Sequence, residues 1–255
     1  MKLFFAVLFA IVLSSPAHAL EIFEILGVDA DPVLRHSELY GYARPFSAEA
    51  HVSIQCPTNC PSRTSVIVCA ASAGWFRTDV DLTRTTVPNL TGTMFEGRKN
   101  AAEVLDMKRS VMIWRPDRNM QYNIVPDRKG YSEQPGTMKP GEKFEVPGPL
   151  QVVKKIEQGT EVIDGHPCRK VLRSIIRYEG AKPLDVTAWE ATDLNGFCVQ
   201  LQYEDKPLFC EDNPCVITIL FKTVSFTPDP TLFEVPKDYR KYDDPLELLM
   251  PSTPK

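Results

Sequence analysis

The chain has 255 residues, of which 43% are hydrophobic and 24% charged, and its formal net charge is -4. This is the composition of an ordinary globular protein, so it excludes a disordered chain, a collagen and a coiled coil. The acidic balance also disfavours nucleic acid as a partner, and the local excess of basic residues over residues 98–118 is better explained by a solvated surface.

Residues 1–19 have the features of a secretory signal peptide. Lys2 precedes an apolar run over residues 3–13, and Ala17-His18-Ala19 supplies the small residues that a signal peptidase requires. We therefore expect cleavage after Ala19 and a soluble protein in the periplasm. No later apolar run reaches the roughly 18 residues of a membrane-spanning helix, so no transmembrane segment is predicted.

The chain after the signal peptide changes from weakly helical to strand-like. Residues 20–50 predict a short helical lead-in, with one segment over residues 20–27 and another opened by Asp31 ahead of Pro32. Residues 51–242 predict a single β domain, and residues 243–255 a C-terminal tail. The expected strands are short, rich in β-branched and aromatic residues and bounded by breakers, and they lie at 51–55, 65–71, 75–86, 111–115, 121–125, 152–157, 160–163, 168–178, 184–191, 197–203 and 215–225.

Turn residues join several of these strands into hairpins. Pro116-Asp117-Arg118-Asn119, Asp164-Gly165 and Asn195-Gly196 each favour a tight turn. In contrast, seven proline and glycine residues interrupt residues 133–149, which predicts a long exposed connection that could serve as a lid or a binding segment. Hairpin-length spacings favour a mainly β (α+β) fold, with a large antiparallel sheet curled into a partial barrel.

The pattern of residues 197–203 is the clearest in the chain. Phe197, Val199, Leu201 and Tyr203 alternate with polar residues and with Cys198. One face of this strand should therefore be buried and the other solvated, with Cys198 on the solvated face.

All seven cysteines follow the signal peptide, where an oxidising compartment favours disulfides. Spacing and intervening turn residues favour three bridges, Cys56–Cys60, Cys210–Cys215 and Cys168–Cys198. Cys69, inside an apolar run, would then be a buried free thiol. Two alternatives remain open: a zinc site, which the three mature histidines do not support by their spacing, and a redox-active pair of Cys56 and Cys60.

Motifs for catalysis are not found. The chain has no Gly-rich phosphate loop, no His-Glu-x-x-His and no Gly-x-Ser-x-Gly elbow. His166 lies between Gly165 and Pro167 in a turn, where a structural role is expected. We therefore assign no catalytic residue, metal ligand or cofactor, and the thiol pair of Cys56 and Cys60 is the remaining enzymatic alternative.

Four stretches, at residues 112–131, 159–168, 189–196 and 228–236, resemble a bacterial family of uncharacterised exported proteins. Gly159-Thr-Glu-Val-Ile-Asp-Gly-His-Pro-Cys168 and Phe233-Glu-Val-Pro236 are the most specific of them. That family is similar in turn to the Lol-type carriers of outer-membrane lipoproteins, which have a LolA/LolB-like fold. The resemblance implies an incomplete antiparallel β-barrel whose concave side is covered by a helix or loop lid and holds acyl chains or another apolar ligand.

These observations lead to a first hypothesis of a non-enzymatic periplasmic binding or carrier protein, whose partner is an apolar ligand or a lipoprotein acyl chain. The candidates for the ligand cavity are the large side chains on short strands, namely Met112, Trp114, Tyr122, Ile124, Trp189, Val199, Leu201 and Tyr203. The alternative is a protein-interaction or sensing module of the cell envelope, without a ligand cavity.

Overall fold

We describe a computed structural model of the chain. The described residues are 31–57, 62–85, 106–136, 138–139, 142–205 and 214–249. The predicted signal peptide, the predicted segment 20–27, Cys60 and Cys210 lie outside them.

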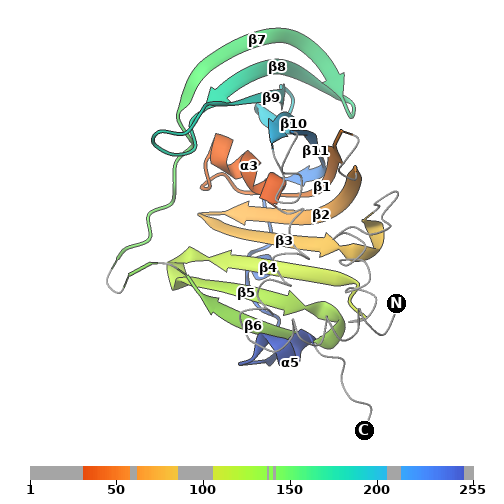
Figure 1. Cartoon of the computed structure of the whole chain (residues 1–255), viewed down its shortest axis with the longest axis vertical. Coiled ribbons are helices and arrows are strands. Elements are labelled where there is room, and N and C mark those ends of the chain that lie inside the picture. Colours follow the sequence, from red (N-terminus) through yellow and green to blue (C-terminus); the bar gives the residue numbers. More distant parts are fainter. Residues whose placement is uncertain are drawn as a thin grey trace.

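The fold is one 12-stranded sheet. The strands are β1 (Phe46–Gln55), β2 (Arg63–Ser72), β3 (Trp75–Asp81), β4 (Arg109–Arg115), β5 (Met120–Val125), β6 (Gly130–Pro135), β7 (Val152–Ile163), β8 (His166–Ile175), β9 (Leu184–Ala191), β10 (Phe197–Asp205), β11 (Cys215–Ser225) and β12 (Arg240–Lys241). Their order is β12-β6-β5-β4-β3-β2-β1-β11-β10-β9-β8-β7, so the sheet of described strands has two edges and is not closed. The upper strands arch over, as Figure 1 shows, which confirms the predicted curled, incomplete barrel.

Short helices complete the described chain. They are α3 (Asp31–Tyr40), α5 (Pro245–Leu249) and the single-turn 3-10 helices η2 (Leu82–Arg84), η3 (Pro116–Arg118), η4 (Pro126–Arg128) and η5 (Pro230–Phe233). The helix predicted to open at Asp31 is α3. The strand predicted over residues 75–86 ends earlier, at Asp81, because the Asp81 side chain accepts a hydrogen bond from the Thr83 backbone and caps η2.

The sheet is built from two antiparallel meanders. Strands β1 to β6 form the first meander, and the short strand β12 pairs with β6 in parallel at its outer edge. Strands β7 to β11 form the second meander. The pairing of β1 with β11 joins the two. The predicted hairpin turns are confirmed: Asn119, Asp164 and Asn195 all adopt positive φ, as tight turns require. The two strands predicted over residues 152–163 are the single strand β7, which passes through bulges instead of breaking.

Cross-strand partners in an antiparallel ladder share a face, so the register defines two faces of the sheet. The inner face is the side of α3, and the term inner row is used here for six successive partners from β1 to β6: Ala48, Cys69, Thr78, Met112, Asn123 and Ser132. Ala48 and Cys69 belong to the same buried cluster as Val33 and Leu39 of α3. The outer face carries the alternate residues, among them Ala70 and Ile113.

The connection predicted over residues 133–149 begins only after Pro135, because residues 130–135 form β6, a strand that was not predicted from the sequence. Its described residues contain no helix or strand, and they link the second strand from one edge to the opposite edge of the sheet (Figure 1). The chain must cross most of the sheet at about 4.8 Å per strand, which requires an extended path. On its way it is fixed to the end of α3: the Leu150 backbone donates to Glu38 O at 2.7 Å.

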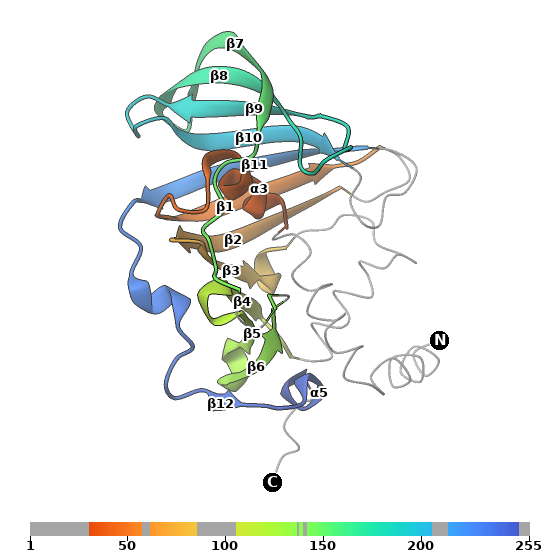
Figure 2. The same cartoon turned by 90° about the vertical axis from the view of Figure 1, so that its left-hand side faces the viewer.

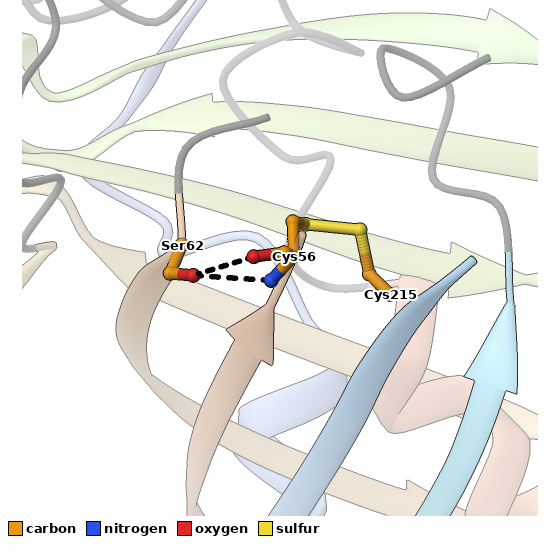
Figure 3. The surroundings of a disulfide bond; sticks show 3 residues. All are labelled: Cys56, Ser62 and Cys215. Carbon is orange, nitrogen blue, oxygen red and sulfur yellow. Dashed lines mark hydrogen bonds between the residues drawn. A yellow bond between two sulfur atoms is a disulfide. The ribbon is translucent and has the colours of Figure 1, made fainter. Parts of the chain in front are cut away.

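The predicted disulfides need correction. Cys56 is bonded to Cys215, not to Cys60, and Cys215 is therefore not bonded to Cys210 (Figure 3). Gln55 and Val216 are partners in the β1–β11 ladder, so the two cysteines come next to each other across it, with 4.3 Å between their Cα atoms. The bridge joins the two meanders, and it also excludes the proposed redox pair of Cys56 and Cys60.

Cys168 and Cys198 do not form the predicted bridge either; both are buried free thiols. β9 lies between their strands, where Cys168 pairs with Ala191 and Cys198 with Glu190. Consecutive residues of β9 point to opposite faces, so the two sulfurs are separated by two strand spacings and by the sheet itself. Cys198 is buried rather than solvated, because a bulge follows it in β10. Cys69 is a buried free thiol, as predicted.

Candidate ligand-binding face

Helix α3 covers the upper part of the inner face. It lies beneath the arch of β7 and β8 (Figure 1), and its buried residues include Val33, His36 and Leu39. The helix ends where Gly41 adopts a φ of 89°, a conformation that favours glycine. The inner face of the sheet under α3 is therefore part of a packed hydrophobic core.

His36 is packed inside this core among four aromatic rings. Its ring centroid lies 4.5 Å from that of Phe197, 4.9 Å from those of Phe46 and Phe221, and 5.1 Å from that of Tyr40. Neither ring nitrogen has a hydrogen-bond partner among the described residues. Burial, with a smaller contribution from the positive charge of Arg44, lowers the pKa of His36 to about 3. His36 is therefore a neutral component of the core at physiological pH.

A buried ionic group holds the end of α3 against β8 and β9. The Tyr40 hydroxyl donates to Glu190 Oε1 at 2.9 Å, Arg173 donates to the same oxygen, and Arg169 donates to Oε2 at 3.3 Å. Burial opposes ionisation of Glu190, but the Arg173 guanidinium and the Tyr40 hydroxyl hold the pKa of this carboxyl below its usual range. The group is a clamp between helix and sheet.

The structure divides the predicted cavity residues into three sets. Val199, Leu201 and Tyr203 are buried in the core cluster that contains Val33 and Leu39 of α3. Met112 and Trp114 lie on the inner face of β4 beyond α3, and both are half-buried.

The remaining three face the other way. Tyr122 is the partner of Ile113 and Ile124 of Val111, so both lie on the outer face. Trp189 follows the inner residue Ala188 and is also outward, where its indole donates to Glu161 Oε2 at 2.9 Å. Among the predicted residues, Met112 and Trp114 thus remain half-buried on the inner face, with Trp114 packed against the edge of the core that contains α3.

A segment after β11 covers the outer face of β3 to β5. This outer strap, residues 226–239, contains η5 and runs down one side of the sheet (Figure 2). Phe233 is buried against Ile113 and Ile124, and Trp75 packs on its ring at 5.7 Å. The Arg115 guanidinium donates to the Phe233 carbonyl at 3.2 Å and to Glu234. Two of the stretches that carry the sequence resemblance, residues 112–131 and 228–236, therefore contact each other across the outer face.

The lower part of the inner face is polar, a feature that the sequence analysis did not identify. Asn123 is 3% exposed and Ser132 1% exposed, yet the Asn123 Nδ2 and Ser132 Oγ atoms have no hydrogen-bond partner among the described residues. The available signal was alternation: Asn123 lies between Tyr122 and Ile124, whose apolar side chains occupy the opposite face. These two residues are called the amide–hydroxyl pair below.

Neither a metal centre nor a membrane helix emerges from the described residues. Within them, no three His, Cys, Asp or Glu side chains are grouped to hold a metal ion. Nor does this part of the chain contain a helix long and apolar enough to cross a membrane. His166 makes a hydrogen bond to Asp193 at 2.8 Å at the end of the β7–β8 hairpin.

No protein-family model matches the chain, and no curated protein matches it. Among solved structures, it is similar to LprF from Mycobacterium bovis, with 16% identity, a TM-score of 0.40, and coverage of 86% of this chain and 97% of that one. It is also similar to the lipoprotein LppX from Mycobacterium tuberculosis (13%, 0.37, 85% and 99%) and to a LolA superfamily protein from Nitrosomonas europaea (9%, 0.32, 82% and 98%). A LolA superfamily protein is thus among the solved structures to which the chain is similar.

Proposed function

We propose that the protein is an exported, non-enzymatic binding or carrier protein for a ligand with an apolar chain. The ligand would lie on the inner face of β3 to β6, between α3 and α5. The observation that carries this proposal is the different chemistry of the two faces there. The outer strap packs a buried Phe233 on the outer face, whereas the inner face combines the half-buried side chains of Met112 and Trp114 with the buried, unpartnered polar atoms of Asn123 and Ser132 among the described residues.

The two helices set the limits of this surface. α3 closes the inner face over β1 and β11, the strands that it contacts. At the other end, α5 contacts β6, and a Cβ atom added at Gly130 would lie 2.6 Å from Leu248 of α5. An apolar chain on the face between them would contact Met112, whose flexible thioether adapts to differently shaped ligands, and the aromatic face of Trp114.

The position of the three tryptophans allows a direct test. Trp114 is on the inner face, whereas Trp75 and Trp189 are on the outer face. The variant Trp75→Phe/Trp189→Phe retains the inner indole, and Trp75→Phe/Trp114→Phe retains an outer one. Each is mixed with a phospholipid brominated on its acyl chains, because bromine quenches indole fluorescence on contact.

Saturable quenching of Trp114, with little quenching of Trp189, is the expected result. Equal quenching of both indoles would indicate nonspecific adsorption, and the absence of quenching at Trp114 would contradict the proposal. Lipid extraction of the protein purified from its own cell envelope provides a second measurement, in which an acyl-containing species should be released on denaturation.

Protein binding along β7 is a second candidate function. β7 is an edge strand that is exposed along nearly its whole length, and Val162 is 71% exposed. The unpaired backbone groups of a long, exposed edge strand can accept an extended segment of a partner as an additional strand. Crosslinking in the envelope should then capture a defined partner with the natural protein and lose it with Val162→Asp; an unchanged capture would exclude this edge.

A further inference from the structure

We propose that the amide–hydroxyl pair, Asn123 and Ser132, binds the carbonyl oxygen of an uncharged ester or amide group in the ligand. This inference rests on the proposed function and specifies the polar part of the ligand. The two residues are direct cross-strand partners at the β6 end of the inner row, and Met112 is the next partner on β4. A ligand anchored there could lay its apolar chain toward Met112 and Trp114.

The amide–hydroxyl pair has two hydrogen-bonding groups that are not used within the described residues. Gln121 Nε2 donates to Asn123 Oδ1 at 3.0 Å, which fixes the amide and turns its Nδ2 donor away from Gln121. Ser132 Oγ is the second group that has no hydrogen-bond partner within the described part of the chain. Buried polar groups are almost always hydrogen-bonded, because leaving one without a partner costs free energy. Two such groups side by side on one face therefore indicate an acceptor that the described residues do not supply.

The surrounding charge defines which acceptor fits. On the inner face of β3 to β6, the inner row is flanked by one row of cross-strand partners on each side. Among the described residues, none of these three rows contains a charged side chain. Their members are Phe76, Thr78, Val80, Ser110, Met112, Trp114, Gln121, Asn123, Val125, Gly130, Ser132 and Gln134. The carboxylate of Asp79 and the guanidinium of Arg109 pair on the outer face. An anion buried here would lack a counter-charge. A neutral carbonyl oxygen, which needs only donors, suits the site.

Competition between matched probes tests the inference. The variant Trp75→Phe/Trp189→Phe, which retains Trp114, is first loaded with brominated phospholipid. A competitor is then added from cyclodextrin to displace this lipid. The competitor is either a long-chain fatty acid methyl ester or the straight-chain alkane of the same length. The protein with the natural Asn123 and Ser132 should bind the ester about 10-fold more tightly than the alkane, because one to two net hydrogen bonds give a difference of this size. The double variant Asn123→Leu/Ser132→Ala should bind the two probes equally.

The control is Thr78→Val, an exchange of similar volume on the same row two strands away, which should keep the preference for the ester. If the double variant does not fold, Ser132→Ala alone decides, and it should reduce the preference about threefold. Without ligand, the double variant should unfold at a higher urea concentration than the natural pair. A lower concentration would mean that the pair is already satisfied in the free protein, and would overturn the inference.

The outcomes separate the two proposals. If neither probe displaces the lipid and Trp114 is not quenched, the proposed function itself fails. If the natural pair binds ester and alkane equally, or if the double variant keeps the preference, the function stands and the carbonyl site is refuted.

Discussion

The neutral histidine under α3 makes the stability of the fold depend on pH. His36 has a pKa of about 3 in the folded chain, against an ordinary value of 6.5. Between these values the unfolded state binds a proton that the folded state does not, so stability falls as the pH falls below about 6.5. The same linkage gives a loss of about 2 kcal/mol near pH 5 relative to neutral pH.

The substitution His36→Phe keeps an aromatic ring and removes both nitrogens. We expect it to raise the free energy of unfolding at neutral pH by about 1 kcal/mol, because two unpartnered polar atoms leave the core. It should also remove about 2 kcal/mol of the difference in stability between neutral pH and about pH 5. Urea unfolding followed by circular dichroism at both pH values measures each effect.

A matched control is His51→Gln on β1. His51 is half-exposed, and its Nε2 lies 2.7 Å from Glu49 Oε1. This exchange should change the pH dependence much less than His36→Phe does. If His36→Phe and the natural chain lose the same stability on acidification, the imidazole is protonated or hydrated inside the fold, and the argument from burial is refuted.

Three further results are expected. Replacing Phe233, which is 1% exposed, with Ala should lower the free energy of unfolding by about 3–5 kcal/mol in urea titrations, and a loss below about 1 kcal/mol would mean that the outer strap is not packed as described. Replacing Cys56 and Cys215 together with Ser removes a link across a sequence separation of 159 and should cost about 3–5 kcal/mol; reduction of the natural protein should reproduce the loss, and an unchanged midpoint would contradict the bridge. Alkylation of the native protein at neutral pH should spare Cys69 and Cys198, because burial raises the pKa of both thiols to about 12; peptide mapping would show either one modified before unfolding if this were wrong.

Most strands could be predicted from the sequence, because alternation and turn residues are local. The exceptions are β6, β12 and the start of β1 at Phe46, which lies inside the helical lead-in predicted over residues 20–50. Leu184–Ala191 and Cys215–Ser225 have the predicted bounds, and the Asn195-Gly196 turn lies where two-residue hairpin chemistry places it. The order of the strands is not local. Nothing near residue 46 indicates that β1 pairs with β11, so the bridge across that ladder could not be found from cysteine spacing.

The face on which each candidate cavity residue lies could be predicted only in part, for a related reason. Alternation in β5 separates Tyr122 and Ile124 from Asn123, but it does not say which set faces the concave side. That choice is made by the outer strap, whose Phe233 comes from a segment more than a hundred residues later and packs on Ile124. The size of Tyr122 and Ile124 predicts that they line the ligand side, whereas in the structure they pack in the core of the opposite face and the buried polar Asn123 lies on the concave side.

The joint between β1 and β11 also has a consequence for how the chain folds during synthesis. Because a polypeptide emerges N-terminus first, β1 is complete long before β11 is made. Until then, one of the two edges of β1 has no strand to pair with. The first meander can form early, but the sheet becomes continuous only when residues 215–225 arrive. During that interval the thiol of Cys56 has Cys60 as its nearest neighbour in sequence. Formation of the native bridge is therefore expected to be slow and to depend on thiol–disulfide exchange, so catalysts of disulfide isomerisation should speed maturation more than they change the final stability.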